Sequence, residues 1–336
     1  MTNRRAISAN DPLRIGVLGV ANITPRALTE PVNDEPRAVL QAIAARDRAR
    51  AEAYASDERI PNVHDDYQAV IDDPEVEVIY NPLPISLHHE WTLKALAAGK
   101  DVLCEKSIAM NAGEAREMAD AARDAGRVLM DAFHYRYHPA FIRTVELLRD
   151  GRIGTIEHLE AIFHTAVTDL TNIRLIYAMG GGVTMDIGCY PVSWVRHASG
   201  EEPAVISATA ETGPEHVDTM LEAELRFPSG ATGRVSGDMR AGTEFANSLT
   251  VTGSSGKLHF ENPLVPQRGH HIDLETVDGS ERLEFDRRGT YHYQLDAFLD
   301  AVERGAPLWT DGEDAVRQMA AIDACYVAAG LPLRGS

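Results

Sequence analysis

The sequence predicts a two-domain α/β protein, with a doubly wound parallel sheet in the N-terminal domain and a large, mostly antiparallel open sheet in the C-terminal domain. The 336 residues exceed the usual size of one hydrophobic core. Residues 13–131 alternate short apolar runs with segments of helical period, which is typical of strand-helix units. After about residue 151, longer β-rich segments replace this alternation, so a second domain with different strand pairing is expected.

The first half contains five candidate strands that are apolar on both faces, as strands of a buried parallel sheet are. They are Leu13–Leu18, Val39–Ala45, Val78–Asn81, Val102–Cys104 and Val128–Met130. Three helices are predicted between them, because apolar residues recur at spacings of three and four. These helices are Arg48–Ala55, His88–Ala98 and Glu114–Ala125. In such a sheet, ligands bind in a crevice at the carboxyl ends of the strands.

The second half contains six candidate strands, several of which alternate apolar and polar residues. They are His158–His164, Ala204–Thr212, Met220–Phe227, Ala231–Gly237, Ser248–Thr252 and Lys257–Phe260. Alternation predicts a sheet with one covered face. Residues 291–329 return to helical period. The expected domains are therefore residues 1–131, residues 132–300, and a helical segment over 301–336 that packs back on the first domain.

Composition narrows the classes of function. The formal net charge is −19, and no block of Lys or Arg could follow a phosphate backbone or an anionic membrane, so neither is expected as a partner. Three scattered cysteines resemble neither a disulfide framework nor a metal site, and no metal is expected. Residues 6–13 lack the apolar core of a signal peptide. A cytoplasmic protein is expected.

The first strand runs into a turn suited to a dinucleotide. A dinucleotide fold needs a tight turn there and a backbone that lets a pyrophosphate approach a helix N-terminus. Gly19 and Ala21 fill the first two fingerprint positions, and Thr24 stands at the third. The pattern is weak alone, but it opens the first strand-helix unit of an alternating domain. We therefore expect Gly19, Ala21, Asn22 and Ile23 to contact the dinucleotide.

The end of the second strand bears on the choice between NADP and NAD. An acid placed there would bond the ribose hydroxyls and repel a 2′-phosphate, but Arg46 stands at that position. A guanidinium can pair bidentately with a phosphate. NADP is therefore favoured over NAD, although the neighbouring Asp47 and a merely solvated Arg46 leave NAD open.

Two further segments carry residue types that can move a proton. Glu105 and Lys106 follow the fourth candidate strand at the ligand-binding edge, where a lysine can hold a reacting oxygen, although a surface lysine is the alternative. Asp186 and Tyr190 follow a triple-glycine stretch and share a face if the segment is helical. Pro191 limits that helix, because proline is tolerated only in a first turn or at a kink.

Together these segments resemble the glucose-fructose oxidoreductase/inositol dehydrogenase/MocA family, abbreviated Gfo/Idh/MocA. The similarity is greatest to its branch of dimeric dihydrodiol dehydrogenases and NADP-linked aldose 1-dehydrogenases. It runs over nearly the whole chain and is carried by Arg14–Gly19, Tyr80–Pro84, Leu87–His88, Ala98–Lys100, Cys104–Lys106, Phe133–Pro139 and Gly180–Tyr190.

The resemblance implies a Rossmann domain followed by an α/β domain whose open sheet commonly forms a dimer interface. It also implies that Lys106 is the catalytic lysine of a Glu-Lys-Pro motif, that Asp186 is the family's acid, and that Tyr190 replaces a histidine. The nicotinamide side would be lined by Pro82, Leu83, His88 and Glu105. Ser107 replaces the motif's proline and Asp101 a common histidine, and Ser107 puts the pose of Lys106 in question.

The expected function is reversible hydride transfer between NADP and a CH–OH or C=O carbon of a sugar, sugar derivative or cyclic diol. Lys106, Asp186 and Tyr190 are the catalytic candidates. Substrate contacts are expected from Arg136, His134, His164 and Arg174, each of which could equally be a surface or core residue. Two alternatives stay open: transient use of the nicotinamide for elimination or hydrolysis, and a non-catalytic dinucleotide sensor. A homodimer or higher homo-oligomer is expected.

Overall fold

The computed structural model describes residues 11–169 and 171–336, and its chain forms two compact units. The first unit contains residues 1–109, 113–134 and 291–316, and the second contains residues 110–112, 135–290 and 317–336. Residues 1–10, on which most of the expectation about a signal peptide rests, lie outside the described part. The domain boundaries expected from the sequence remain predictions.

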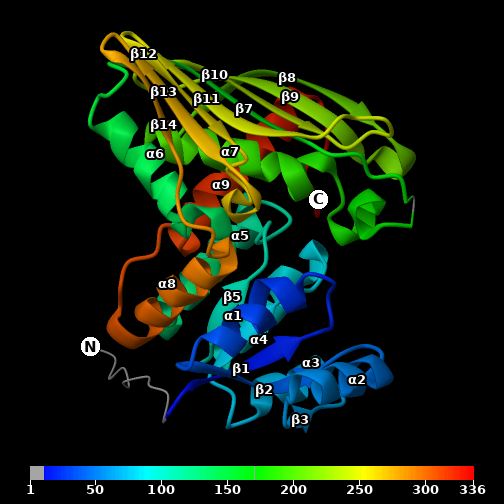
Figure 1. Ribbon diagram of the computed structural model, residues 1–336. Coiled ribbons are helices and arrows are strands. Elements are labelled where there is room, and N and C mark those ends of the chain that lie inside the picture. The colour runs from blue at the N-terminus through cyan, green and yellow to red at the C-terminus, as the bar shows by residue number, and fades with distance from the viewer. Residues whose placement is uncertain (1–10, 170) are drawn as a thin grey trace. The chain divides into compact units, whose positions relative to one another are not determined.

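The first unit is built on a six-stranded parallel sheet with the order β3-β2-β1-β4-β5-β6 (Figure 1). This order, in which β1 and β4 are neighbours, is that of a Rossmann fold, and its ligand crevice forms where the order reverses. The strands are β1 (Leu13–Leu18), β2 (Ala38–Ala44), β3 (Asn62–Val63), β4 (Val78–Asn81), β5 (Asp101–Cys104) and β6 (Leu129–Asp131). Residues of β4, β5 and β6 are all buried, as the continuous apolar runs predicted.

Helices connect these strands and return the chain to the sheet. They are η1 (Pro25–Thr29), α1 (Glu30–Asp34), α2 (Arg48–Glu58), α3 (Tyr67–Asp72), η2 (Ile85–Leu87), α4 (His88–Ala97), α5 (Ala112–Ala125) and α8 (Thr290–Arg304). Glycine ends α4: Gly99 has φ +75°, and its amide bonds the Leu96 carbonyl. The last helix, α9 (Gly312–Ala328), contributes residues to both units.

The second unit contains an eight-stranded sheet with the order β14-β13-β12-β11-β7-β10-β9-β8. The β7–β10 pair is parallel and the other pairs are antiparallel. The strands are β7 (Ile156–His164), β8 (Ala204–Thr212), β9 (Asp218–Arg226), β10 (Thr232–Asp238), β11 (Ala246–Gly253), β12 (Gly256–Glu261), β13 (His271–Thr276) and β14 (Gly279–Leu283). The mostly antiparallel sheet predicted from the sequence is confirmed.

Helices of the second unit lie along one face of this sheet (Figure 1). They include α6 (Pro139–Arg149) and α7 (Cys189–Ser199), and α7 packs against β7, β10 and β11. The short helices are η3 (His134–Tyr137, which begins in the first unit), η4 (Ile173–Leu175), η5 (Tyr177–Met179), η6 (Thr184–Gly188), η7 (Pro214–His216) and η8 (Pro266–Arg268).

Burial alternates along strands of this sheet. On β9, Leu221, Ala223 and Leu225 are buried, whereas Glu224 and Arg226 are exposed. The alternation predicted from these residues is therefore confirmed. The opposite face carries charged side chains.

The remaining differences from the sequence predictions have local causes. The two-residue strand β3 was not predicted, because it is too short for a periodic pattern. Strands β13 and β14 were also missed, and β14 (GSERL), at the edge of the sheet, is mostly exposed and lacks a buried face to produce alternation. Within the described residues, no helix combines the length and apolarity needed to cross a bilayer.

Candidate active site

The carboxyl ends of β1, β4 and β5 bring three predicted segments to one edge of the first unit's sheet. The amide of Gly19 donates to the carbonyl of Ala44 at 2.7 Å, and the amide of Glu105 donates to the carbonyl of Asn81 at 3.0 Å. The turn after β1, the loop after β4 and the Glu105–Lys106 segment are thus held by the same parallel ladder. Because this edge includes the β1/β4 switch point, it is where a dinucleotide is expected.

The turn after β1 depends on one glycine. Gly19 has φ +95°, and a Cβ there would lie 3.2 Å from Cδ2 of Leu83, so a side chain would be both strained and crowded. Ala21 at the second fingerprint position is half-buried, and Asn22 is exposed. The helix starts directly afterwards, and the amide of Ala27 donates to the carbonyl of Ile23 at 2.8 Å. The turn therefore leads into a helix N-terminus with an accessible backbone, which fits a pyrophosphate.

At the end of β2, Arg46 and Asp47 have different roles. The Asp47 carboxylate caps α2, accepting from the amides of Ala49 at 3.1 Å and Arg50 at 3.4 Å. Arg46 is exposed. Arg50 donates from Nη2 to the carbonyl of Val20 at 2.9 Å, next to the Gly19 turn. The Asp47 carboxylate is thus engaged by the helix, Arg50 is bound to the turn, and the Arg46 side chain is exposed beside them.

The Glu105–Ser107 segment is anchored through Glu105. The hydroxyl of Tyr80 donates to Oε1 of Glu105 at 2.8 Å, and both side chains are buried. Burial raises the pKa of Glu105, while the Tyr80 hydrogen bond and the charge of Lys106 oppose this rise. Lys106 itself is half-buried, and the Lys106–Ser107 peptide bond is cis. The lysine thus follows a fixed, buried carboxyl group.

His88 connects the loops after β4 and β5. Its Nε2 lies 2.7 Å from the carbonyl oxygen of Leu83, and its Nδ1 lies 2.9 Å from that of Ser107. The side chain is 1% exposed, and burial lowers its pKa to about 4. In this conformation the ring offers almost no surface to a dinucleotide. Its contacts instead lie at the backbone carbonyls of Leu83 and of Ser107, the residue after Lys106.

In the second unit, Asp186 and Tyr190 lie on a continuous helical segment that starts with a π-helical turn. Asp186 belongs to η6 and Tyr190 to the first turn of α7. Pro191 follows the π-helical turn by three residues, so it lies inside the continuous segment, near the point where the helix changes from π to α geometry, and not in a first turn. Asp186 forms an ion pair with Nε of Arg174. Two residues predicted separately, one catalytic and one substrate-binding, are therefore in contact.

Tyr190 is packed in an aromatic cluster. Its ring centroid lies 5.9 Å from that of Phe163, 6.1 Å from Tyr135 and 6.1 Å from Trp194. Edge-on and tilted ring contacts of this kind fix the plane of a phenol. The hydroxyl of Tyr135 lies 2.7 Å from Oγ of Ser193, one helical turn further along α7. The Tyr190 ring is therefore held in one orientation.

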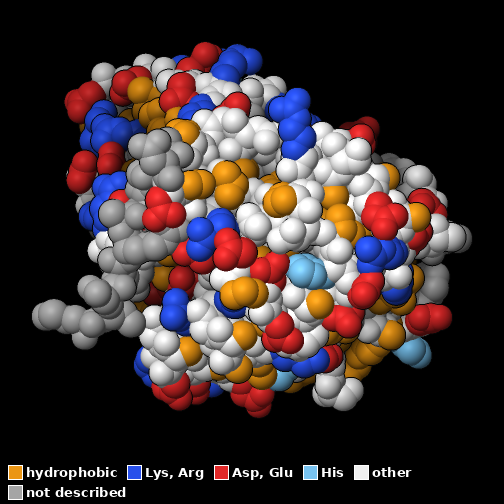
Figure 2. Space-filling view, turned by 90° about the horizontal axis from the view of Figure 1, so that it is seen from below, with side chains coloured by type: hydrophobic (Ala, Val, Ile, Leu, Met, Phe, Trp, Pro, Cys, Tyr) orange, Lys and Arg blue, Asp and Glu red, His pale blue; other side chains and the backbone are white. Residues whose placement is uncertain are grey.

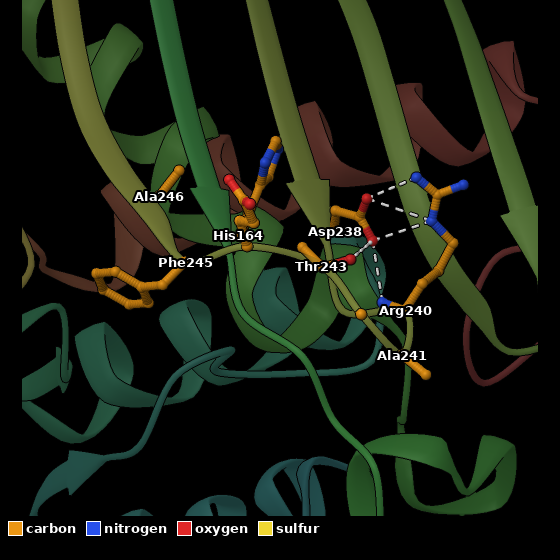
Figure 3. Close-up of a pocket in the computed structure, with 9 residues that line it drawn as sticks. His164, Asp238, Arg240, Ala241, Thr243, Phe245 and Ala246 are labelled. Carbon is orange, nitrogen blue, oxygen red and sulfur yellow. Dashed lines mark hydrogen bonds and ion pairs between the residues drawn. The ribbon is translucent and has the colours of Figure 1, made fainter.

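His164 lies in a pocket of about 570 Å³ at the ends of β7 and β10 (Figure 3). Arg240 and Asp238 form an ion pair at 2.6 Å, and Oγ1 of Thr243 donates to Asp238 at 2.9 Å, so this network shapes the pocket's loop. His164 Nε2 lies 2.8 Å from Oγ of Ser236, and burial lowers the pKa of His164. Asp186 and Arg174 are not among the residues that line this pocket.

The other two predicted substrate residues are buried. His134, in the first unit, is 2% exposed, and its ring centroid lies 4.0 Å from that of Tyr291. Arg136, in the second unit, is 7% exposed, and its guanidinium lies 5.5 Å from the centroid of Phe141. The structure thus places His134, Arg136, His164 and Arg174 in four different surroundings.

Some residues with a clear structural part in these sites were not singled out from the sequence. Tyr80 holds Glu105, Arg50 reaches the Gly19 turn, and Asp218 binds the start of η6 through Thr184. Arg50 could have been noticed as a further arginine four residues after Arg46. Asp218 gave no signal, because its partner lies 34 residues away.

No group of three His, Cys, Asp or Glu side chains that could hold a metal ion occurs in residues 11–169 and 171–336. The side chains of Cys104, Cys189 and Cys325 are buried thiols that form no disulfide with one another.

Comparison with known proteins identifies the family. Residues 13–133 match the profile of an oxidoreductase family with an NAD-binding Rossmann fold, and residues 141–259 match the GFO/IDH/MocA C-terminal domain. The chain is 34% identical to D-xylose 1-dehydrogenase (NADP(+)) 2 of Haloferax volcanii over 322 residues, covering 94% of this chain and 97% of the relative. The chain belongs to the Gfo/Idh/MocA family of oxidoreductases.

Further relatives act on other sugars. A dTDP-3,4-didehydro-2,6-dideoxy-alpha-D-glucose 3-reductase of Actinomadura kijaniata is 29% identical over 319 residues, covering 94% of this chain and 95% of the relative. The solved structure of a 3-ketoreductase from the same organism, in complex with NADP and TDP-benzene, has a TM-score of 0.88 at 28% identity, covering 94% and 98%.

An aldose-aldose oxidoreductase from Caulobacter crescentus, complexed with glycerol, has a TM-score of 0.87 at 27% identity, covering 95% of this chain and 98% of that one. The first unit is thus a nicotinamide dinucleotide-binding Rossmann domain, in a family of sugar and diol oxidoreductases.

Proposed function

We propose that this protein is an NADP-dependent dehydrogenase or reductase that transfers a hydride between the nicotinamide and a CH–OH or C=O carbon of a sugar, sugar derivative or cyclic diol. The observation that carries the proposal is the edge of the parallel sheet, where the Gly19 turn, the β4 loop and the Glu105–Lys106 segment are held together by ladder hydrogen bonds. The xylose dehydrogenase and ketosugar reductase among the relatives support a carbohydrate substrate.

The proposed chemistry divides between the cofactor and this chain. A bound nicotinamide supplies or accepts the hydride. Lys106 holds the substrate oxygen and moves its proton, because an ammonium at this edge follows the buried Glu105 and can act as a general acid. Tyr190 is proposed as a second proton-transfer group, since its ring is fixed by Phe163, Tyr135 and Trp194.

Asp186 is proposed to orient a substrate hydroxyl. Its carboxylate side chain is 15% exposed and is paired with Arg174, so its oxygens lie beside a cation and can accept a hydrogen bond from substrate. Arg174 is 46% exposed and could contact the substrate from the same pair. His134, Arg136 and His164 remain proposed substrate residues, of which His164 has the most space around it.

For the dinucleotide, Gly19, Ala21, Asn22 and Ile23 are proposed to hold the pyrophosphate. Arg46 is proposed to bind the 2′-phosphate of NADP, which the capping role of Asp47 supports. Pro82, Leu83 and Glu105 are proposed to line the nicotinamide side, and His88 is proposed to keep Leu83 and Ser107 in place.

The proposed partners are small molecules and a second copy of the chain. On the face shown in Figure 2, Lys and Arg side chains lie among Asp and Glu side chains, which supports neither a nucleic acid nor a membrane surface as a partner. A homodimer or higher oligomer is proposed to form through the helix-free face of the eight-stranded sheet. A cytoplasmic location is also proposed, which the three buried cysteines without a disulfide support.

The decisive experiment is a turnover assay with the purified full chain, a panel of aldoses, ketosugars and cyclic diols, and either NADP(H) or NAD(H). The proposal expects net change in nicotinamide absorbance with a member of the panel, and faster turnover with NADP(H). Product formation without net cofactor reduction would instead identify transient use of the nicotinamide in elimination or hydrolysis. Dinucleotide binding without any turnover would support the sensor and contradict the proposal.

A further inference from the structure

Arg334, two residues before the end of the sequence, has its whole side chain inside the second unit. It is 0% exposed, and its guanidinium lies 4.5 Å from the ring centroids of both Tyr177 and Tyr326. Nη2 forms an ion pair with Asp218, which is also 0% exposed. Burying a charged arginine costs desolvation free energy. The two ring contacts and the ion pair with Asp218 offset this cost.

The arginine also binds the glycine turn that precedes Asp186. Its Nε donates to the carbonyl oxygen of Gly181 at 3.0 Å. A Cβ at Gly182 would collide with Asp218 and would lie 2.8 Å from Nη2 of Arg334, so glycine is required for this approach. Gly182 also has φ +144°, a conformation that favours glycine.

The partner carboxylate binds the start of η6. Oδ2 of Asp218 accepts from the amide of Thr184 at 2.9 Å and from its hydroxyl at 2.6 Å. The hydroxyl of Tyr326 donates to Oδ1 of the same carboxylate at 3.1 Å. Arg334 and Asp218 therefore hold both sides of the short stretch from Gly181 to Thr184.

This stretch is bonded in turn to both members of the Arg174–Asp186 pair. The amide of Gly182 donates to the carbonyl of Arg174 at 2.9 Å, and the carbonyl of Gly182 accepts from the amide of Asp186 at 3.0 Å. The hydrogen bond from Arg334 to Gly181 and the bonds of Gly182 thus connect the Arg334 side chain to the backbones of Arg174 and Asp186.

The backbone of Arg334 is fixed as well. The side-chain amide of Asn111 donates to the Arg334 carbonyl oxygen at 3.0 Å. Asn111 directly precedes α5, so the C-terminal segment is anchored to a residue far from it in sequence. The position of the guanidinium therefore does not depend on the last residues of the chain alone.

We propose that Arg334 is a positioning residue that sets the backbone of the Gly181–Thr184 turn, and through it the placement of Asp186 and Arg174 toward substrate. The catalytic part of this inference rests on the proposed function, while the structural part does not. Loss of the guanidinium frees the turn, so substrate is oriented less well although the dinucleotide site in the first unit is intact. Misplacement of a positioned group can cost on the order of a hundredfold in rate.

The test compares Arg334→Ala, Arg334→Lys and the control Arg143→Ala in the full chain. Arg143 lies on α6 in the same unit, is 39% exposed and pairs with Glu146, so its loss should change little. Hydrogen exchange of residues 174–186, NADPH affinity, kcat and KM are measured for each. For Arg334→Ala we expect faster exchange in this segment, unchanged NADPH affinity and at least roughly a tenfold lower kcat/KM.

Millimolar guanidinium should restore part of the activity and protection of Arg334→Ala, whereas urea at the same concentration should not. A general loss of stability would not be rescued in this selective way. The lysine variant keeps a cation but lacks the donor to Gly181, so intermediate values are expected.

The inference is overturned if folded Arg334→Ala exchanges and turns over like the wild type. If Arg334→Ala does not fold, Arg334→Lys decides, and wild-type behaviour of that variant overturns the inference. Wild-type protein without turnover on any substrate would refute the proposed function, and the exchange of residues 174–186 would still decide whether Arg334 holds the turn.

Discussion

The segments that carry the proposed catalytic side chains are held in different ways. In the first unit, Lys106 follows a parallel strand, and its neighbours bond to adjacent strand ends and to His88, all within about one strand-helix unit of sequence. In the second unit, Asp186 follows a glycine turn that is held by Asp218 and Arg334, which are 32 and 148 residues further along the chain.

This difference predicts which substitutions should affect each of the two segments. The Lys106 segment depends on the ladder of a common fold, in which the carboxyl ends of β1, β4 and β5 always meet. The Asp186 segment depends on a buried ion pair, which is strongly destabilising to break because it leaves an uncompensated charge. Substitutions near Lys106 should therefore affect chemistry, and substitutions far from Asp186 in sequence should still affect its placement.

The largest effect should come from Lys106→Met. We expect turnover to fall by roughly a hundredfold or more, the scale for loss of a general acid-base group, while NADPH affinity changes little. Methionine keeps much of the apolar stem, and the fingerprint turn at Gly19 is untouched. Stopped-flow or steady-state turnover and NADPH fluorescence titration measure the two quantities separately. Wild-type turnover would show that the chemistry does not use Lys106.

Tyr190→Phe provides the companion measurement. If Lys106 and Tyr190 act on one proton, the double variant should cost less than the sum of the single losses in activation free energy. Additive losses would indicate independent roles. Tyr190→Phe should keep the ring contacts to Phe163 and Trp194. An unchanged thermal stability of this variant therefore serves as the control.

The same difference explains what the sequence could predict. Short-range patterns, namely apolar runs and local turn signals, predicted three features of the first unit. These are its alternation of strands and helices, the Gly19 turn and the position of Lys106 after a strand. The pairing of Arg174 with Asp186, and the burial of His134, Arg136 and Arg334, depend on contacts between residues distant in sequence. Composition and period carry no information about such pairs, so the sequence left surface and core positions equally open for His134 and Arg136 and gave no sign that Arg334 is internal.

The next effect concerns the pH dependence of stability through His88. Burial lowers the pKa of His88 to about 4 in the folded protein, below the ordinary value of 6.5. The unfolded chain therefore binds a proton that the native state does not. The stability that comes from the neutral His88 is fully present above pH 6.5. The free energy of unfolding falls by roughly 3 kcal/mol as the pH falls from 6.5 toward 4.

His88→Gln should flatten this part of the profile, because an amide does not titrate but can still donate to one of the two carbonyls. Chemical denaturation of both proteins between pH 7 and pH 4 gives the difference that isolates His88 from other groups, such as His138, whose pKa burial also lowers to about 4. Parallel curves for the two proteins would mean that the folded protein does not keep His88 neutral in this pH range.

A smaller effect is expected on cofactor choice. Arg46→Ala should weaken NADP binding by about tenfold or more, the scale of a charge-assisted hydrogen bond, and should weaken NAD binding much less. Arg50→Ala is the matched control, since Arg50 binds the Val20 carbonyl and its loss should affect both dinucleotides. Isothermal titration with each dinucleotide makes the comparison. Equal losses for NADP and NAD in Arg46→Ala would contradict the assignment of the 2′-phosphate to Arg46.

The smallest effect should appear on the helix-free face of the second unit's sheet, where the proposed dimer forms. Arg234 there lies 2.9 Å from Glu222 and 3.5 Å from Glu160, all partly exposed. Arg234→Ala leaves these two carboxylates facing a second copy of a chain with net charge −19, so repulsion should weaken the dimer. Exposed ion pairs contribute about 0.2–1 kcal/mol, so the dissociation constant should rise only a few-fold.

The control is Arg304→Ala, which removes an exposed arginine of the first unit that pairs with Asp300. Light scattering over a concentration series measures the change, and raised salt should reduce the difference between Arg234→Ala and the wild type, because salt screens the carboxylates. A wild-type protein that stays monomeric at high concentration would contradict the proposed interface, and an unchanged dissociation constant in Arg234→Ala would place it elsewhere on the molecule.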